Sequence, residues 1–214
     1  TGAYHTMAEH GPDVPAVRGP IHERYERTRQ TIASFLGVEP GEIAFIRSIS
    51  EGLSIVAYGI DWEPGDEVIV TDEENQSGVI IWLSLSEKAG IKVRKLPLVA
   101  DRQELLSRLE EMLTDRTRLL SFSDVTTDTG TRLPAAEICR LAHRYGIPVV
   151  YDAAQSVGQY PVDIREIDCD FYVCTGHKWL LSGWGVGMLY VRKDWVSKLK
   201  VSWTGAHAAI WNKD

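Results

Sequence analysis

The sequence predicts an α/β fold of three layers, in which helices cover both faces of a mostly parallel β-sheet. Short apolar runs of strand length alternate with amphipathic stretches of helical period along most of the chain. Gly and Pro residues stand between many of these segments and indicate turns. Strands that alternate with helices pair in parallel, because each helix carries the chain back to the same end of the sheet.

Five segments have the apolar spacing of helices. The first carries apolar residues from Ile21 to Leu36 among charges and has a stop signal at Gly37. Ser48 and Glu51 have the spacing of a capping box, so another helix should begin there. The last of the five, residues 134–145, has Pro134 in its first turn and Gly146 after its end. The expected helices are residues 21–36, 48–58, 78–89, 102–113 and 134–145.

Seven short apolar segments are expected to be strands. Two of them follow Pro-Gly turn signals, at residues 40–41 and 64–65. By contrast, residues 1–20 are rich in Gly and Pro and show no apolar period, so this stretch is predicted to be an extended N-terminal arm or loop. The expected strands are residues 42–46, 66–70, 91–96, 117–122, 148–151, 171–174 and 186–191.

The composition argues against nucleic acids and membranes as partners. The 214 residues carry a formal net charge of -7 and contain no basic cluster, whereas proteins that bind polyanions concentrate positive charge. No apolar run approaches the roughly 20 residues of a membrane-spanning helix. Cys139, Cys169 and Cys174 lack the pairing of a metal site. We therefore expect no metal, and buried thiols in a reducing cytoplasm.

Two segments with polar residues follow neighbouring predicted strands. Asp152 comes just after one strand and Lys178 just after the next, and ligands of open α/β sheets bind beyond the carboxyl ends of the strands. Taken alone, an Asp after a strand is commonly a cap and a Lys is commonly solvated. Pyridoxal phosphate, however, requires both an amine for its aldehyde and an acid for its pyridinium nitrogen. Together the two residues predict a site for this cofactor.

The helix expected at 48–58 offers a place for a phosphate group. The first backbone N–H groups of a helix have no partner within it, and they attract anions. Ser50 adds a hydroxyl to this end. Capping boxes are common, so this signal is weak without the other two segments.

The segments 151–158 and 175–180 resemble motifs of the class V aminotransferases, which are fold-type-I pyridoxal-phosphate enzymes. The resemblance extends, in the same order, through the stretches 65–70, 121–131 and 185–192. The family includes cysteine desulfurases, C–S lyases, isopenicillin N epimerase-like proteins and several transaminases. The resemblance implies the fold of the large domain of these enzymes.

The resemblance also implies how the chain is divided and assembled. Residues 1–20 would be an N-terminal arm and residues 21–214 the pyridoxal-phosphate-binding large domain. The C-terminal small domain of relatives, which usually supplies the arginine for the substrate carboxylate, is expected to be absent from this chain. Relatives are homodimers with the cofactor close to the subunit interface, so we expect a homodimer.

The resemblance assigns roles to residues around the cofactor. Lys178 matches the lysine that forms the Schiff base, and Asp152 matches the acid paired with the pyridine nitrogen. Gln155 matches the amide that bonds the phenolic oxygen. The matches to phosphate ligands are His177, Thr175, Ser50 and the backbone N–H of Ile49.

Two positions depart from the family pattern. After Glu74, where relatives carry His or an aromatic residue that stacks on the cofactor ring, this sequence has Asn75. Asn75 can cover the ring but offers no titrating proton, and it is a local turn residue if the alignment slips by one. Thr127 stands where many relatives carry Asn near the phenolic oxygen. The first departure weakens the case for a cysteine desulfurase, in which the stacked His is thought to transfer protons.

The function that the resemblance implies is an enzyme acting on an amino acid or related amine by transamination or β-elimination. Lys178 and Asp152 would be its catalytic residues, with Lys178 acting as general base at the α-carbon once the substrate amine has displaced it. Two alternatives stay open. One is a cysteine desulfurase or amino-acid epimerase, and the other is a pyridoxal-phosphate-binding regulatory module without catalysis.

Overall fold

The computed structural model describes residues 2–11 and 14–202. Within these residues, seven strands form one sheet in the order β1-β7-β6-β5-β4-β2-β3. Four neighbouring pairs are parallel, and β7 is antiparallel to both β6 and β1. The predicted mostly parallel sheet is therefore confirmed. The strands are β1 Ile43–Ile46, β2 Glu67–Thr71, β3 Lys92–Leu96, β4 Thr117–Ser123, β5 Val149–Asp152, β6 Phe171–Thr175 and β7 Gly187–Val191.

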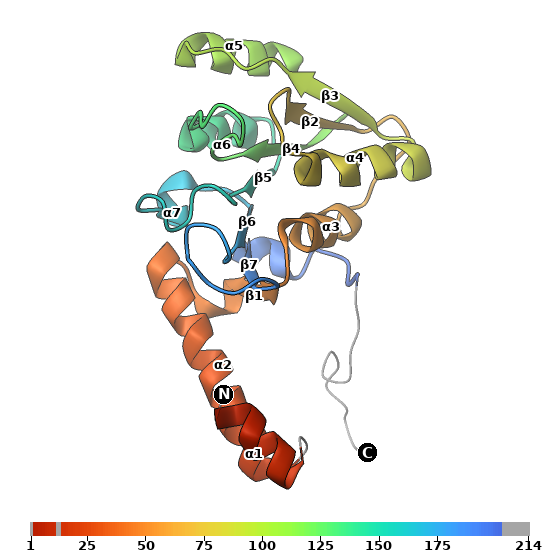
Figure 1. Ribbon diagram of the computed structural model, residues 1–214. Helices are drawn as coiled ribbons and strands as arrows, with labels where there is room; N and C mark the ends of the chain where they lie inside the picture. The colour runs from red at the N-terminus through yellow and green to blue at the C-terminus, as the bar shows by residue number, and fades with distance from the viewer. Residues whose placement is uncertain (1, 12–13, 203–214) are drawn as a thin grey trace.

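Helices cover both faces of this sheet, which confirms the three predicted layers (Figure 1). Val68 and Val70 of β2 belong to an apolar core shared with α3 and α4. Ile69, between them, belongs to a second core shared with α5, α6 and α7. Burial on both faces of one strand is typical of a parallel sheet between helices. The helices are α1 Gly2–His10, α2 Pro15–Leu36, α3 Ile49–Gly59, α4 Gln76–Ala89, α5 Arg102–Met112, α6 Ala135–Arg144, α7 Ile164–Ile167 and α8 Lys193–Val196, with a 3₁₀ turn, η1, at Pro40–Glu42.

The prediction of an extended arm or loop over residues 1–20 is wrong for the described part of this stretch, because α1 and the start of α2 are helical. The two helices extend away from the sheet (Figure 1). Pro15 occupies the first turn of α2, where its fixed φ suits the helix and its missing N–H is not needed. α2 then continues through Pro20 and ends at Leu36, and Gly37 caps its C-terminus with a φ of 73°. Residues 1 and 12–13 lie outside the described residues.

Three short elements, η1, α7 and α8, were not expected from the sequence. Each is only three or four residues long. An apolar period of 3.6 residues cannot be recognised within a single turn. The helices α3 to α6 and all the strands lie within a few residues of their predicted positions, whereas α1 was not predicted and α2 begins six residues before its predicted start.

β7 is antiparallel to β6 because the loop 176–186 joins the two strands without a crossover helix. The two backbones come very close at Gly187. A Cβ atom added there would lie 2.5 Å from the carbonyl oxygen of Cys174. Glycine is therefore the residue that this close approach permits.

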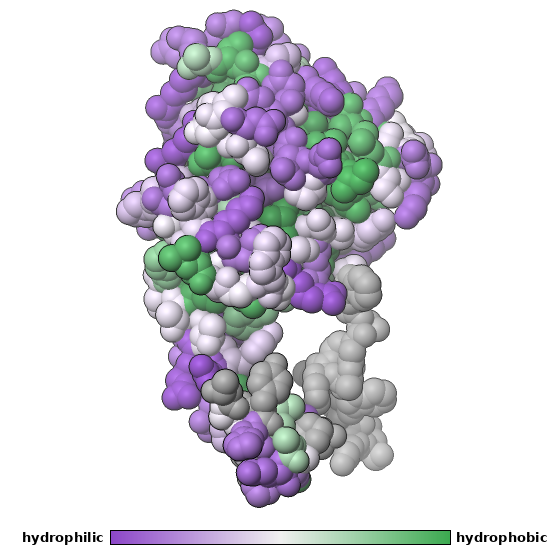
Figure 2. All heavy atoms as spheres, in the orientation of Figure 1, coloured by the Kyte–Doolittle hydropathy of each residue, from purple (hydrophilic) through white to green (hydrophobic). Residues whose placement is uncertain are grey.

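The surface in Figure 2 mixes hydrophilic residues with several apolar patches. Ile80 and Leu83 on the outer face of α4 are 61% and 46% exposed. Among the described residues, no helix is long and apolar enough to cross a lipid bilayer.

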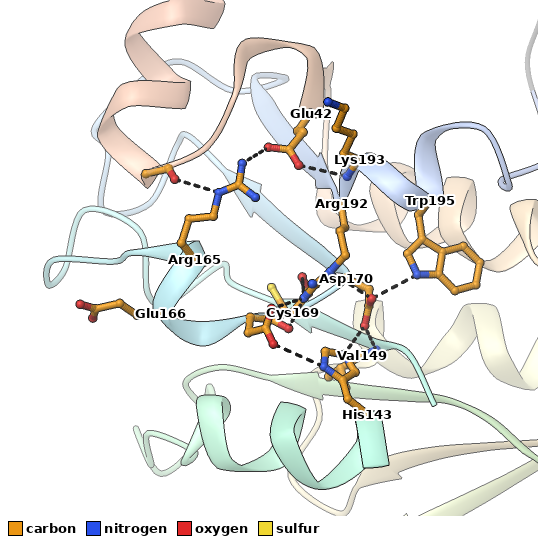
Figure 3. A network of polar contacts seen from close by, with 12 residues as sticks. Glu42, His143, Val149, Arg165, Glu166, Cys169, Asp170, Arg192, Lys193 and Trp195 are labelled. Carbon is orange, nitrogen blue, oxygen red and sulfur yellow. Dashed lines mark hydrogen bonds and ion pairs between the residues drawn. The ribbon is translucent and has the colours of Figure 1, made fainter. Parts of the chain in front are cut away.

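A buried carboxylate, Asp170, organises the edge of the sheet where the parallel strands begin (Figure 3). One of its oxygens accepts hydrogen bonds from His143 Nε2 and from the backbone N–H of Val149, both at 2.9 Å. Its other oxygen accepts a hydrogen bond from Trp195 Nε1 at 3.1 Å. Arg192 adds an ion pair at 3.3 Å. This network joins α6 and α8 to the ends of β5, β6 and β7.

The His143 contact makes the stability of the fold depend on pH. The hydrogen bond to Asp170 raises the pKa of His143 above its ordinary value, against the opposing effects of burial and Arg192. Because the folded pKa is the higher one, the stabilisation is fully present below the unfolded pKa of about 6.5 and is lost as pH rises through the folded value. We expect His143→Gln to lower the free energy of unfolding by about 1 kcal/mol more at pH 5.5 than at pH 8.5. Urea unfolding at both pH values measures this difference, and equal losses at the two pH values would contradict the prediction.

Candidate functional site

A cavity of about 250 Å³ lies at the carboxyl ends of β4, β5 and β6. α3 and α4 begin at the same edge, because each follows a strand that ends there. Residues from several separate segments of the chain therefore meet around one space. The cavity is lined by all nine residues that the sequence associated with the cofactor, namely Ile49, Ser50, Asn75, Thr127, Asp152, Gln155, Thr175, His177 and Lys178.

Asp152 is the acid of this cavity. It ends β5, its side chain is buried, and its Oδ1 accepts a hydrogen bond from the Ala154 N–H at 3.0 Å. Burial raises the pKa of Asp152 to about 6, although the Ala154 N–H and the charge of Lys178 act in the opposite direction. A cation beside the carboxylate would favour its ionised form. The cavity thus holds a carboxylate suited to a positively charged group on a ligand.

A second carboxylate, Glu74, lies beside Asp152 and contributes to its raised pKa. The sequence did not indicate this contact. Glu74 accepts hydrogen bonds from the hydroxyl and backbone N–H of Ser123, at 2.6 and 2.9 Å, and from the Thr71 hydroxyl at 2.7 Å. A Cβ atom added at Gly78 would lie 3.5 Å from Glu74 and 3.8 Å from Asp152, so both carboxylates face the start of α4.

Ser123 could have been found from the sequence. It ends β4 and pairs in register with Asp152 at the end of β5. A polar residue at the end of a buried parallel strand is the same signal that identified Asp152. Glu74 carries no such signal, because its contact with β4 depends on the order of strands in the sheet.

Lys178 lies three residues after the end of β6 and lines the cavity. Within the described part of the chain, its ammonium group makes no hydrogen bond and no ion pair within 4.0 Å. Its positive charge nevertheless favours the ionised form of Asp152, so the two groups interact across the cavity. The amine is therefore free to react with or bind a ligand.

His177 is held from two directions. Its Nδ1 shares a hydrogen bond of 2.7 Å with the Thr175 hydroxyl, which leaves Nε2 for a ligand. Its ring stacks on that of Trp184, with ring centroids 3.9 Å apart and an angle of 15° between the planes. Trp184 was not expected to take part in the site. It lies in a glycine-flanked loop and is 84% exposed.

Gln155, Thr127 and Asn75 complete the wall of the cavity. Gln155 Oε1 accepts a hydrogen bond from Trp179 Nε1 at 2.9 Å. Asn75 caps α4, since its Oδ1 accepts hydrogen bonds from the backbone N–H and hydroxyl of Ser77 at 3.0 and 2.8 Å. Asn75 therefore combines a local structural role with a position at the cavity.

The N-terminus of α3 supplies the anion-binding end of the cavity. Ser48 caps the helix by accepting a hydrogen bond from the Glu51 N–H at 3.2 Å. The predicted capping box forms only in part, because the Glu51 carboxylate binds the N–H of Arg47 instead of that of Ser48. Ile49 and Ser50, the first residues of α3, both line the cavity. The free N–H groups and the positive end of the helix dipole suit a phosphate group.

Two other cavities are larger, at about 460 and 580 Å³. The first lies among α5, α6 and α7, and the second lies at the edge where the parallel strands begin. Neither combines a buried carboxylate with an unpaired amine. In residues 2–11 and 14–202, no group of three or more His, Cys, Asp or Glu side chains is arranged to hold a metal ion. The smaller cavity is therefore the one with the chemistry of a site.

The sequence matches the family model described as "Aminotransferase class-V" over residues 4–210. A cysteine desulfurase of Enterobacter sp. (strain 638) is 34% identical over 194 residues, which cover 88% of this chain and 47% of the relative. The chain thus spans about half the length of this curated relative.

Two solved structures of the enzyme C-DES have similar folds. One is a mutant with glycine covalently linked to its pyridoxal-phosphate cofactor; it has a TM-score of 0.93 and 30% identity, covering 99% of this chain and 57% of that one. The other is the complex of this cystine C–S lyase with its product cysteine persulfide. It has a TM-score of 0.90 and 31% identity, covering 95% of this chain and 55% of that one.

Proposed function

Because the chain belongs to the class V aminotransferase family, we propose that its cavity binds pyridoxal 5'-phosphate and that the protein transforms an amino acid or related amine. The observation that carries this proposal is the meeting of Asp152, Lys178 and the N-terminus of α3 around one cavity. These groups provide an acid, an amine and an anion site. Pyridoxal phosphate has a pyridine nitrogen, an aldehyde and a phosphate to match them.

We propose the following roles for the residues at the two ends of the cavity. Lys178 would bond to the cofactor aldehyde, and Asp152 would hold the proton on the pyridine nitrogen. When bound, the cofactor would supply the electron sink that stabilises a negative charge at the substrate α-carbon. Lys178, displaced from the aldehyde by the substrate amine, would move the α-proton. The phosphate would lie against Ser50, Thr175, His177 and the backbone N–H of Ile49.

We propose that Gln155, Thr127 and Asn75 contact the cofactor ring. Gln155 would donate a hydrogen bond to the phenolic oxygen, with Thr127 nearby. Asn75 would cover one face of the ring without supplying a proton, because a carboxamide does not titrate. Glu74 would act through Asp152, since its negative charge favours the protonated form of that carboxyl and thus raises its basicity.

Transamination and β-elimination are the reactions that this arrangement supports. We favour β-elimination on a sulfur-containing amino acid as the first to test, because relatives at 31–34% identity carry the names cysteine desulfurase and cystine C–S lyase. In β-elimination the α-proton leaves, the C–S bond breaks and the sulfur departs with the bonding electrons as a thiol or persulfide. Water would then convert the remaining enamine into ammonia and a 2-oxo acid. Lys178 is placed to take that proton.

Cysteine desulfurase is the second candidate, and the Enterobacter relative is the observation in its favour. Desulfuration needs a reactive thiol to receive the sulfur. Cys139, Cys169 and Cys174 are all buried, none lines the cavity, and burial raises the pKa of Cys174 to about 12. The 214 residues contain no other cysteine, so an accepting thiol would have to come from outside them.

The experiment adds pyridoxal phosphate to the full-length protein and follows its visible absorbance, then adds a panel of amino acids including cysteine and cystine. Release of ammonia and 2-oxo acid would support β-elimination. Transfer of the amino group to an added 2-oxo acid would indicate transamination, and persulfide without ammonia would indicate desulfuration. Solvent deuterium at the α-carbon without net product would indicate epimerisation. Tight cofactor binding without any response to amines would overturn the catalytic proposal and favour a regulatory module.

We also propose a cytoplasmic homodimer in which residues 21–214 form the cofactor-binding domain and residues 1–20 an arm. Buried free thiols support a reducing compartment. The proposed boundary falls within α2, and residues 203–214 lie outside the described residues. Sedimentation of the full-length protein tests the dimer, and a monomer at micromolar concentration would exclude it.

A further inference from the structure

Gln155 is an ambiguous ligand taken by itself. A carboxamide can present either its oxygen or its NH₂ group to the cavity, and the two ends have opposite hydrogen-bonding character. The orientation of the amide decides whether a hydrogen-bond donor is available to an anionic oxygen at this point of the cavity. A neighbouring group must fix that orientation, because the terminal torsion of Gln is broad.

Trp179 is that neighbour. Its Nε1 lies 2.9 Å from Gln155 Oε1, and an indole N–H can only donate. It must therefore face the oxygen end of the amide, which leaves the NH₂ end for other partners. In the part of the chain that the structure describes, Gln155 Nε2 donates to no protein acceptor.

The backbone around Trp179 is also fixed. Gly158 has a φ of 93°, and a Cβ atom added there would lie 2.7 Å from the Trp179 carbonyl oxygen and 3.0 Å from the Leu180 nitrogen. The following turn closes through hydrogen bonds from Leu181 N to Lys178 O at 3.1 Å and from Ser182 N to Gly176 O at 2.9 Å. Trp179 thus presents its N–H from a constrained position, although the residue is 49% exposed.

We propose that Trp179 is a positioning residue that turns the NH₂ end of Gln155 toward the cavity, where it donates to an anionic oxygen of the ligand. The inference rests on the proposed binding of pyridoxal phosphate, whose phenolic oxygen is an acceptor of this kind. Trp179 directly follows Lys178, so one loop both carries the reactive amine and orients the residue on the opposite segment. Trp179 acts through Gln155 and does not itself contact the ligand.

The test is a double-mutant cycle with Trp179→Phe and Gln155→Ala, read as the pH at which the visible absorbance of the bound cofactor changes. A donor at the phenolic oxygen favours the more negative form of the chromophore and lowers its pKa. Trp179→Phe keeps an aromatic ring and removes only the N–H group. We expect each single variant to raise this pKa by about 0.5 unit, a threefold change of the kind that one neutral hydrogen bond produces. The double variant should show no further rise.

Two outcomes would overturn the inference. One is an unchanged chromophore pKa in Trp179→Phe while the chromophore pKa of Gln155→Ala shifts, and the other is fully additive pKa shifts in the double variant.

A second experiment uses NMR on the cofactor-free protein. The Trp179 indole proton should exchange with solvent at least about threefold faster in Gln155→Ala, and the Gln155 amide signals should move in Trp179→Phe.

The NMR arm separates this inference from the proposed function. If pyridoxal phosphate fails to bind any variant, the proposed function is wrong, and the NMR arm still decides the orientation of Gln155. If the cofactor binds and the NMR signals of both residues are unaffected by either substitution, the positioning role of Trp179 is wrong. Thermal unfolding of all variants checks that each is folded.

Discussion

Lys178→Ala is expected to lower the turnover rate by about a thousandfold or more. The protein should keep its fold and should still retain pyridoxal phosphate, but without a covalent link. Lys178 supplies the amine of the cavity, and within the described residues its ammonium group makes no hydrogen bond and no ion pair. Truncating the side chain therefore breaks no hydrogen bond or ion pair within the described residues. It removes both the attachment point and the group that moves the α-proton, and a loss of about 4 kcal/mol in transition-state stabilisation corresponds to a thousandfold in rate.

The measurement combines borohydride reduction with mass mapping. In the parent, reduction should fix the cofactor onto Lys178. In Lys178→Ala, no lysine should carry the adduct, although the cofactor should still be retained on gel filtration. Lys92→Ala is the matched control, because Lys92 is an exposed lysine at the start of β3, near the opposite edge of the sheet. An adduct on another lysine in the parent would show that Lys178 is not the attachment site.

The positions of Asp152 and Lys178 could be predicted from the sequence because the rule that places them is local. Each follows a short apolar strand, and in parallel sheets such positions share one edge. The strands pair as this reasoning requires, with Tyr151 opposite Tyr172 on adjacent β5 and β6. The structure therefore brings the two residues to one cavity.

The contacts that support these residues could not be predicted from the sequence. Glu74 reaches Ser123 because β4 lies between β2 and β5 in the sheet, and strand order is not encoded in local apolar spacing. Trp179 reaches Gln155 through a side-chain hydrogen bond between two loops. Such contacts depend on side-chain directions that only the assembled fold defines.

The N-terminal helices show a different failure of sequence reasoning. Gly and Pro were taken to exclude helix from residues 1–20. Pro15, however, stands in the first turn of α2, where proline is favourable, and Val17 is buried. The burial of Val17 and the position of Pro15 within the helix outweigh the low average helix propensity of Gly and Pro.

Asp152→Asn is expected to reduce single-turnover α-proton abstraction by about a thousandfold or more. The asparagine oxygen can still accept the hydrogen bond from the Ala154 N–H, so the turn after β5 should be retained. The substitution removes the charge that would hold the pyridine nitrogen protonated. Loss of one partner of a buried charge pair costs about 3–5 kcal/mol, which is about two to four orders of magnitude in rate and centres on about a thousandfold.

Gln155→Ala is the matched comparison for this substitution. It removes one neutral hydrogen bond from the same cavity, so we expect a loss of about 1–2 kcal/mol, or roughly tenfold. Both variants should retain the cofactor, because the phosphate end around Ser50, His177 and the start of α3 is unchanged. The difference in size between the two effects is what identifies Asp152 as the partner of the pyridine nitrogen.

The cofactor-free protein gives an independent readout of Asp152. Burial raises its pKa to about 6 from an ordinary value of 3.8. A carboxyl with a raised folded pKa loses stability as pH rises from the unfolded toward the folded value, because the ionised form is disfavoured in the folded state. Asp152→Asn should therefore unfold at a higher urea concentration than the parent at pH 8, and the unfolding midpoints of the two proteins should converge at pH 4.

The kinetic comparison decides the role of Asp152. If Asp152→Asn abstracts the α-proton nearly as fast as the parent, or if Gln155→Ala is impaired as severely, then Asp152 is not the residue that holds the pyridine nitrogen.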